Sequence, residues 1–350
     1  MDFLKHIIDS TENIKDALSK LNVLGADAIL FVVDERNNKL LGSLTDGDIR
    51  RGIINGLDFN KPMTDFIQPQ PVYIKKDNYS LQDLISYKER NLRIIPIVDD
   101  DLKIVDILNF RIKSSLLPIE AVVMAGGRGQ RLMPLTENCP KPMLKIGDKP
   151  ILEYNIDRLI YFGIDTIHIS INYLGHMIES YFGDGSKKHI KIDYIKEADP
   201  LGTIGSVKLI EKFDKTEILI MNSDLLTNID YEDFYHSFKA ADADIAVAAT
   251  GYTVDIPYAV MEVDADNTIK SLREKPQYIY YSNAGIYLVK KEILDLVPRS
   301  SFDMPDLMNK AIEIGKKVIT YPILGYWLDI GKMQDYNKAQ EDIKHINFNK

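Results

Sequence analysis

The spacing of apolar and polar residues divides the chain into two parts that order their helices and strands differently. In the first part, a helix pattern ending near Leu21 precedes a strand at Ala28–Val33, a second strand to Leu44 and a helix from Asp48. A similar series starts at Val72. Short strands of period two flanked by helices of period 3.6 predict small α+β units. The two series form a weak internal repeat.

The second series repeats the elements in nearly the same order. Its expected elements are a helix at Leu81–Glu89, a strand at Ile94–Val98, an acidic turn at Asp99–Asp101 and a strand at Lys103–Leu108. The boundary of the first part follows at Lys113–Pro118, where polar Lys-Ser-Ser gives way to Leu-Leu-Pro. We therefore expect a first domain at residues 1–116 and a larger one at residues 119–345.

The larger part alternates helices and strands regularly. Its expected elements are helix Ile151–Phe162, strand Thr166–Ile171, helix Gly175–Phe182, strand Lys191–Ile195, helix Thr203–Phe213 and strand Glu217–Met221. This alternation predicts an α/β fold with a mostly parallel, doubly wound, Rossmann-like sheet. Ligands bind such sheets at the carboxyl ends of the strands, so the residues after Ala125 and Met221 are expected at the site.

A glycine-rich loop follows the apolar strand Ala121–Ala125. The loop combines three glycines with two arginines: Gly126, Gly127, Arg128, Gly129 and Arg131. Glycines lack the side chains that would keep backbone N–H groups away from phosphate oxygens, and the arginines add positive charge. The loop therefore predicts a site for a nucleoside triphosphate, although an ordinary strand-to-helix turn would show the same glycines.

Lys141 stands between Pro140 and Pro142, which stiffen the chain around its ammonium group.

Two other phosphate-binding motifs do not fit the glycine-rich region. A dinucleotide-binding loop, as in a dehydrogenase, needs a third glycine where this chain has Leu132, and a P-loop needs Gly-Lys-Ser/Thr, which is absent.

Composition narrows the range of functions. The chain has 350 residues, of which 45% are hydrophobic and 27% charged, and a formal net charge of −9, which argues against a general nucleic-acid binder. Cys139 is the single cysteine, so no intrachain disulfide is expected and a reducing cytoplasm fits. Neither a signal peptide nor an apolar run long enough to cross a bilayer is recognised, so no membrane association is expected.

The string GGRGQRLMPLT, followed by PKPML, resembles the signature of the sugar nucleotidyltransferases. Five further strings stand in the order of that family: EADPLGTIGS from Glu197, MNSD from Met221, REKP from Arg273, NAGIY from Asn283 and YWLDIG from Tyr326. The resemblance implies attack by a sugar 1-phosphate on the α-phosphorus of a nucleoside triphosphate, with pyrophosphate as the leaving group.

The same resemblance implies roles for individual residues. The catalytic residues would be Arg131, Lys141, Asp224, Lys275 and Asp329. The nucleotide would bind to Ala125, Gly126, Gly127, Arg128, Gly129, Glu197, Gly202 and Thr203. The sugar would bind to Tyr258, Glu274, Lys275 and Asn283. Mg²⁺ would be the cofactor, held by Asp224 and Asp329, since it prefers one or two carboxylates together with substrate phosphates.

The sequence determines the base of the nucleotide and the identity of the sugar less closely than the reaction. Glu197 offers two acceptor oxygens that suit the N1–H and 2-amino donors of guanine, and with Leu201, Gly202 and Thr203 it resembles guanylyltransferases such as those for mannose 1-phosphate, so GTP is expected. Alternatively, Glu197 only caps a loop. The stretch Ser301–Leu307 and the first domain resemble bacterial enzymes that make GDP-glucosamine for legionaminic acid, which favours glucosamine 1-phosphate and leaves mannose and heptose 1-phosphates open.

The first domain resembles a pair of cystathionine-β-synthase (CBS) domains through GSLTDGDIRR and RIIPIVDDDLKIVDIL. In such domains, Thr45 and Asp48 would hold the phosphate and ribose of an adenine nucleotide. Asp106 replaces the usual glycine in the second copy, so one nucleotide site at most is expected. Alternatively, the pair only packs or dimerises, and a homo-oligomer is expected. A function of another class would be a nucleotide sensor with a non-catalytic binding platform.

Overall fold

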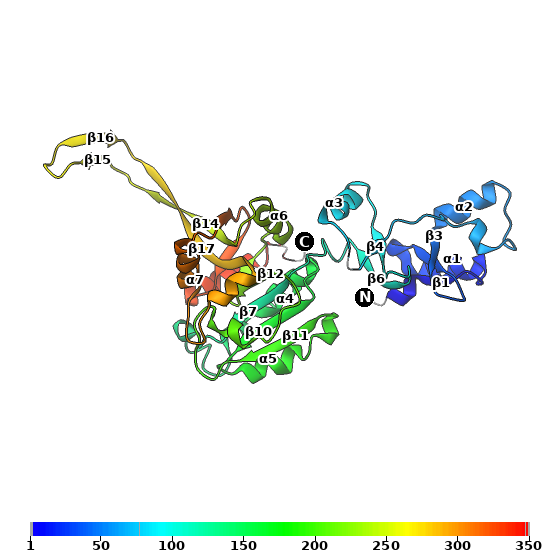
Figure 1. The fold of residues 1–350 in the computed structure, drawn as a ribbon, viewed down its shortest axis with the longest axis horizontal. Coiled ribbons are helices and arrows are strands. Elements are labelled where there is room, and N and C mark those ends of the chain that lie inside the picture. The colour runs from blue at the N-terminus through cyan, green and yellow to red at the C-terminus, as the bar shows by residue number, and fades with distance from the viewer. Residues whose placement is uncertain (1–2, 77, 347, 349–350) are drawn as a thin grey trace. The chain divides into compact units, whose positions relative to one another are not determined.

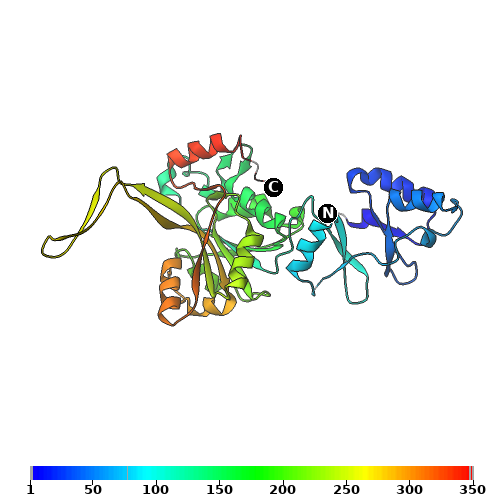
Figure 2. The same cartoon turned by 90° about the horizontal axis from the view of Figure 1, so that it is seen from above.

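The computed structural model describes residues 3–76, 78–346 and 348, which divide into two compact units, Met1–Leu116 and Leu117–Lys350. Figures 1 and 2 show the fold in two views. Each unit has its own hydrophobic clusters, so each is described by itself. Among the described residues, no helix has both the length and the apolar character that crossing a membrane requires.

The first unit contains the predicted repeat. Its first half has strands β1 (Ile7–Asp9), β2 (Leu30–Val33) and β3 (Leu40–Leu44) with helices α1 (Ile14–Leu24) and α2 (Asp46–Ile54). Its second half has strands β4 (Ile74–Lys75), β5 (Ile94–Val98) and β6 (Ile104–Asn109) with helix α3 (Leu81–Glu89). In both halves the first two strands are parallel and the third is antiparallel to the second. The repeat therefore extends to the strand topology.

The second unit is built on a seven-stranded sheet in the order β11-β10-β7-β12-β17-β14-β18. Its strands are β7 (Glu120–Ala125), β10 (Thr166–Ile171), β11 (Lys191–Lys196), β12 (Glu217–Asn222), β14 (Ile245–Asp255), β17 (Gln277–Lys290) and β18 (Val318–Pro322). Only β17 runs against its neighbours, so the sheet is mostly parallel. The predicted α/β class is confirmed.

The remaining elements surround this sheet. The helices are α4 (Ile151–Tyr161), α5 (Gly175–Phe182), α6 (Tyr231–Ala240), α7 (Met304–Glu313) and α8 (Met333–Asp342). The short strands are β8 (Lys145–Ile146), β9 (Lys149–Pro150), β13 (Leu225–Thr227), β15 (Val260–Val263), β16 (Ile269–Arg273) and β19 (Trp327–Asp329). Met304 and Leu307 of α7 pack with Val122 and Ile220 of the sheet, whereas Tyr231 of α6 contacts the sulfur of Met221 at 3.5 Å.

One predicted helix is wrong. In place of a helix at Thr203–Phe213, the structure has a single 3-10 turn at Gly205–Leu209. The physical reason lies before the turn, where the N–H and hydroxyl of Thr203 donate to Asp303 Oδ1 at 2.8 and 3.1 Å. The segment is therefore anchored to the start of α7 instead of continuing as a helix of its own.

Strands β14 and β17 continue beyond the sheet as a two-stranded ribbon. Within the sheet they pair from Ile245 with Val289, and beyond a register shift they pair from Ala249 with Asn283 to Asp255 with Gln277. The antiparallel pair β15 and β16 forms the tip of this ribbon. We call residues 251–282 the arm, which projects from the second unit in both views (Figures 1 and 2).

A buried carboxylate anchors the central strand. Glu120, at the start of β7, accepts the N–H groups of Asp214 and Lys215 at 2.6 and 2.8 Å and lies 2.8 Å from His168 Nε2. Only 2% of Glu120 is exposed. The carboxylate thereby ties β7 to β10 and to the loop that precedes β12.

We expect the substitution Glu120→Ala to lower the free energy of unfolding by about 2–4 kcal/mol, because it leaves two backbone donors and an imidazole without their acceptor. Urea unfolding followed by circular dichroism measures the loss. The matched control is Glu211→Ala on an exposed glutamate, which should change stability by about 0.5 kcal/mol or less. Equal stability of the two variants would contradict this anchoring role.

Candidate functional site

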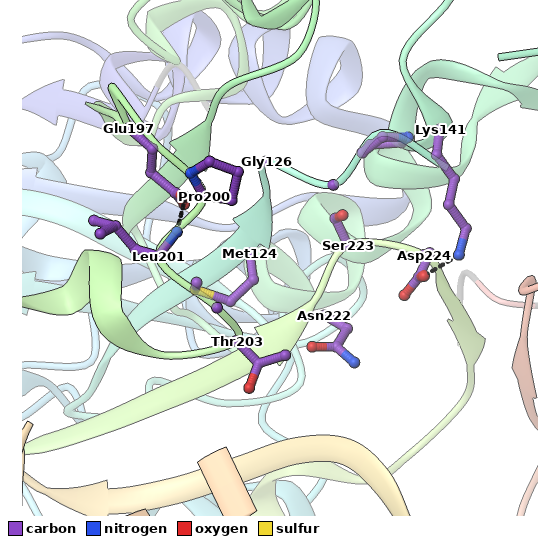
Figure 3. A pocket seen from close by; sticks show the side chains of 13 residues that line it. Met124, Gly126, Lys141, Glu197, Pro200, Leu201, Thr203, Asn222, Ser223 and Asp224 are labelled. Carbon is purple, nitrogen blue, oxygen red and sulfur yellow. Dashed lines mark hydrogen bonds and ion pairs between the residues drawn. The ribbon is translucent and has the colours of Figure 1, made fainter. Parts of the chain in front are cut away.

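A cavity of about 330 Å³ opens at the carboxyl ends of β7 and β12. Figure 3 shows its lining side chains, which come from four separate stretches of the chain. The lining residues are Met124, Gly126, Gly127, Lys141, Pro142, Glu197, Pro200, Leu201, Gly202, Thr203, Asn222, Ser223 and Asp224. Seven residues predicted from the sequence are thus brought together: Gly126, Gly127, Lys141, Glu197, Gly202, Thr203 and Asp224.

The glycines of the loop after Ala125 differ in why the structure favours glycine at each position. A Cβ on Gly126 would lie 3.1 Å from Glu197 Oε1, and one on Gly129 would lie 2.9 Å from the Cβ of Lys141. Gly129 also has a φ of +64°, a conformation that side chains disfavour. A Cβ on Gly127 would meet nothing within 4 Å, so open space adjoins its backbone. The loop can therefore approach a ligand closely, as its composition predicts.

Lys141 lies at the start of a 3-10 turn, Lys141–Met143, beside the cavity. Its side chain is 10% exposed, and its ammonium group forms an ion pair with Asp224 Oδ2. The same nitrogen lies 3.9 Å from Asp329 Oδ1. A buried ammonium is costly unless it is paired, so the lysine is held where the two carboxylates meet.

The two carboxylates come from neighbouring short strands. Asp224 lies between β12 and β13, and Asp329 ends β19, whose residues pair with β13 so that Leu225 faces Asp329. The N–H of Ile330 donates to the carbonyl of Asp224 at 3.0 Å. Within the part of the chain that the structure describes, the Oδ1 atoms of Asp224 and Asp329 are buried and have no hydrogen-bond partner.

Burial raises the pKa of Asp329, and the charge of Asp224 raises it further. Lys141 and Arg131 act in the opposite direction without cancelling the rise. Although 45% of the Asp329 side chain is exposed, its Oδ1 is buried. Two buried carboxylate oxygens without hydrogen-bond partners, on residues whose charges act on each other, are the type of donor that a hard divalent cation prefers. The residues therefore fit Mg²⁺.

The two arginines of the loop differ in position. Arg131 lies beside Gly331, because a Cβ on that glycine would be 3.4–3.6 Å from the guanidinium atoms. Its charge also acts on Asp329, which places it on the carboxylate side of the site. Arg128 instead lies over the ring of Tyr173, with 5.2 Å between its Cζ and the ring centroid. Neither arginine, nor Ala125 or Gly129, lines the cavity itself.

Glu197 follows β11 and already has hydrogen-bond donors from its own chain. Its Oε1 accepts the hydroxyl of Ser170, and its Oε2 accepts the N–H of Leu201 at 3.0 Å. The amide of Asn172 donates to its backbone carbonyl at 2.9 Å. Glu197 thus fixes the loop at residues 197–203, and because each carboxylate oxygen accepts more than one hydrogen bond, a base could still bind to it.

Gly202 and Thr203 are held by the segment before α7. Gly202 has a φ of +78°, and a Cβ there would lie 2.6 Å from the carbonyl oxygen of Phe302. The hydroxyl of Thr203 accepts the N–H of Met304 at 2.8 Å. These contacts give the stretch Ser301–Leu307 a structural role, because it supports one wall of the cavity.

The predicted sugar-binding residues are not brought to the cavity. Tyr258, Glu274 and Lys275 lie on the arm, and Asn283 lies at its base, where its Oδ1 accepts the N–H of Gly285 at 2.9 Å. Sequence reasoning also left residues out. Asn222 and Ser223 line the cavity but had no assigned role, although they stand in the MNSD string directly before Asp224.

In the first unit, Thr45 and Asp48 bind to each other. Thr45 caps α2, and its hydroxyl donates to Asp48 Oδ2 at 2.6 Å, while Arg51 and Gln68 donate to Oδ1 at 2.5 and 3.2 Å. Burial works to raise the pKa of Asp48, but the hydrogen bonds from Thr45, Gln68 and Arg51 outweigh it and lower the pKa. Both residues therefore have a structural role as a capping box.

Comparison with known proteins places these features in a family. The nucleotidyl transferase family model matches residues 120–346, and the CBS domain model matches residues 6–55. The chain is 29% identical over 226 residues to a mannose-1-phosphate guanyltransferase of Pichia angusta, covering 62% of each chain. It thus spans about 62% of that relative's length.

Two shorter proteins are matched along almost their whole length. The chain is 32% identical over 236 residues to the D-glycero-alpha-D-manno-heptose 1-phosphate guanylyltransferase of Aneurinibacillus thermoaerophilus, covering 65% of this chain and 99% of that one. The crystal structure of HddC from Yersinia pseudotuberculosis is similar with a TM-score of 0.50 and 28% identity, covering 64% of this chain and 99% of that one.

We expect the substitution Asp329→Asn to raise the melting temperature at neutral pH, because it removes a buried charge that repels Asp224. The increase should be small, about 2 °C, since water reaches nearly half of the side chain and screens the repulsion. The raised pKa of Asp329 means that the folded state takes up a proton before the unfolded state does, so the penalty is present above the folded pKa. The penalty disappears as the pH falls through that pKa.

Calorimetry between about pH 3 and pH 7, a range that includes the ordinary pKa of an aspartate, measures this difference between the variant and the unmodified protein. The matched control is Asp148→Asn on an exposed turn, which should show no such pH dependence. A variant that melts below the unmodified protein at the upper end of this range would contradict repulsion between the two carboxylates.

Proposed function

Because the chain belongs to the nucleotidyl transferase family, we propose that it transfers a nucleoside monophosphate from a nucleoside triphosphate to a sugar 1-phosphate. The observation that carries the proposal is the meeting of the glycine loop, Lys141, Asp224 and Asp329 at one edge of the sheet. Phosphoryl transfer depends on positioning and charge neutralisation more than on covalent help from the protein, and this set supplies both.

In the proposed reaction, a phosphate oxygen of the sugar 1-phosphate forms a bond to the α-phosphorus of the triphosphate. The bond from that phosphorus to the oxygen that bridges to the β-phosphate breaks, and its electron pair leaves with pyrophosphate. The amides of Gly126 and Gly127 and the guanidinium of Arg131 would hold the leaving pyrophosphate, with Arg128 as a second cation. Lys141 would neutralise charge at the α-phosphate.

Asp224 and Asp329 are the proposed Mg²⁺ ligands. Support comes from their two buried oxygens without hydrogen-bond partners and from the raised pKa of Asp329. When bound, the ion would neutralise charge on the reacting phosphates. Lys141 pairs with Asp224, so its ammonium lies at the proposed metal site, where it would neutralise charge at the α-phosphate.

GTP is the proposed nucleotide. The support is the carboxylate of Glu197 at the cavity wall and the names of relatives that are guanylyltransferases. Leu201, Gly202 and Thr203 would surround the base on that side. A relative of Synechocystis sp., 30% identical over 241 residues with 63% of this chain and 62% of that protein covered, is named as a UTP–glucose-1-phosphate uridylyltransferase, so a uridine nucleotide is the alternative.

Glucosamine 1-phosphate is the proposed acceptor, in a route to legionaminic acid, on the strength of the CBS domain joined to this type of catalytic unit. Mannose and heptose 1-phosphates are the alternatives, and the names of two relatives favour them. Cys139 is the single cysteine, which allows no intrachain disulfide, so a reducing cytoplasm is the proposed location. A homo-oligomer completes the proposal.

A second candidate function is a nucleotide sensor that binds a triphosphate without turnover. The capping box formed by Thr45 and Asp48 does not favour it, since both side chains bind each other instead of facing an open site. The activity measurement below separates the two functions, because a sensor would bind GTP and release no pyrophosphate.

We expect pyrophosphate release in Mg²⁺ buffer when each nucleoside triphosphate is offered with glucosamine, mannose, glucose or heptose 1-phosphate in a grid. The substitution Asp224→Asn should reduce kcat by about 10²–10³-fold, because it removes charge from the proposed metal site. Asp148→Asn is the control and should retain full activity. Activity of the Asp224→Asn protein at the unmodified rate would refute the role given to this carboxylate.

Glu197 is tested with inosine triphosphate, which has the N1–H of guanine but lacks its 2-amino group. If Glu197 accepts both donors, kcat/KM should be about 10-fold lower for inosine triphosphate than for GTP. In the Glu197→Gln protein this ratio should approach one. A ratio that stays unchanged, in a variant with an unchanged melting temperature, would mean that Glu197 only holds the loop at residues 197–203.

A further inference from the structure

The arm leaves the sheet at the edge where the cavity opens. Asn222 lines the cavity, and a Cβ on Gly285 of β17 would lie 2.6 Å from its side-chain nitrogen. Pairing of β17 with β12 ends at Ile286, and pairing of β14 with β18 ends at Ala249. Beyond these points, the two strands of the arm pair only with each other among the described residues.

The paired strands hold the arm away from the cavity of its own chain. The ladder runs from Asn283 to Gln277, and at about 3.3 Å per residue this places Gln277 roughly 20 Å from Asn283. Lys275 lies two residues further out. Folding back would require breaking the ladder between β14 and β17. Figures 1 and 2 both show the arm pointing away from the sheet.

The arm exposes an unusual number of large apolar side chains. They are Tyr252, Tyr258, Met261, Val263, Ile269, Leu272, Ile279, Tyr280 and Tyr281. A two-stranded ribbon has no third layer in which to bury them, and an isolated hairpin is only marginally stable in water. Large apolar side chains exposed in such number on one projecting element are typical of an interaction site. The arm has about 30 residues, which matches the 20–30 residues per side of a specific interface.

Lys275, near the tip, is unpartnered as well. It makes no ion pair with any residue that the structure describes, whereas Lys270 and Arg273 pair with Asp264 and Glu262 within the tip. Its backbone has a φ of +42°, a strained conformation for a residue with a side chain. Backbone strain of this kind is found most often at ligand-binding and active sites.

We propose that the arm binds to a second copy of this chain and places Lys275, together with Glu274 and Tyr258, at the cavity of that copy. A second copy offers a partner for Lys275, because its cavity carries the carboxylates of Glu197 and Asp224, with Asp329 beside Lys141, and no arm residue is among the residues that line it. Exchange of two arms about a twofold axis completes both sites at once and covers both apolar ribbons. The inference rests on the proposed function, which gives Lys275 its role.

The test uses two inactive proteins, one with a defect in the cavity and the other with a defect in the arm. The full-length Asp224→Asn and Lys275→Ala proteins are co-expressed with different affinity tags, and mixed dimers are isolated by two successive purifications. In a mixed dimer, the intact cavity of the Lys275→Ala copy receives the intact arm of the Asp224→Asn copy. One site of two is then complete, so we expect about half of the unmodified pyrophosphate release.

The matched control combines Asp224→Asn with Lys141→Ala, whose defects lie in the same cavity. Every site of that mixed dimer has a defect, so it should remain inactive. An inactive Asp224→Asn and Lys275→Ala pair, with an active unmodified protein, would show that the arm serves its own cavity and would overturn the exchange while the proposed function stands. An unmodified protein that releases no pyrophosphate with any substrate pair would instead refute the proposed function.

A second measurement does not depend on activity. A protein without Cys139 (Cys139→Ser) receives two new cysteines, through Lys275→Cys on the arm and Pro200→Cys at the cavity. This protein is treated with a bismaleimide cross-linker. Exchange predicts a covalent dimer on a denaturing gel. A cross-link within one chain, or no cross-link, would overturn the proposal, and the single-cysteine proteins are the controls. If the arm instead binds another kind of partner, the double-cysteine protein would run as a monomer, as the single-cysteine controls do, and the proposal would be overturned.

Discussion

The contact between Lys141 and Asp224 is the interaction on which the rest of the site depends. It joins the segment after the glycine loop to the end of β12, and Asp329 adds a third stretch of chain through the pairing of β19 with β13. An ammonium group in so buried a position needs a nearby carboxylate, while two adjacent carboxylates need a cation. The arrangement of Lys141 between the two carboxylates meets both needs and leaves one buried oxygen of each carboxylate without a hydrogen-bond partner among the described residues.

The loops around this charge cluster are held by polar contacts, not by regular secondary structure. Glu197 receives hydrogen bonds from Ser170 and Leu201, and Thr203 exchanges hydrogen bonds with Asp303 and Met304. Such contacts restrict the conformations of the cavity wall before a ligand binds. Binding to a preorganised site costs less conformational entropy, because its loops are already ordered.

The arm differs from the rest of the second unit in this respect. The sheet buries its apolar side chains on both faces, whereas the arm is a ribbon with both faces in water. The polar contacts of the arm, such as that of Gln277 with Asp255 at the outer end of the β14–β17 ladder, join the two strands but bury no apolar side chain. The proposed exchange of arms would cover these apolar side chains, and it would complete the site in the same step.

The sequence by itself determined the fold class, most strand and helix positions, and the glycine loop with its chemistry. These properties depend on contiguous residues, through side-chain periodicity and the freedom of glycine at positions such as Gly129. It was wrong about the helix at Thr203–Phe213, because the hydrogen bonds of Thr203 to Asp303 connect residues far apart in the chain.

Only the tertiary structure decided how distant residues combine. It brought Lys141 to Asp224 and Asp329, gave Glu197 donors from its own chain, and tied Thr45 to Asp48 as a cap. It also placed Tyr258, Glu274 and Lys275 on an arm instead of at the cavity. The physical reason is that strand order and the register of β14 with β17 fix these distances, and no local pattern of apolar and polar residues encodes them.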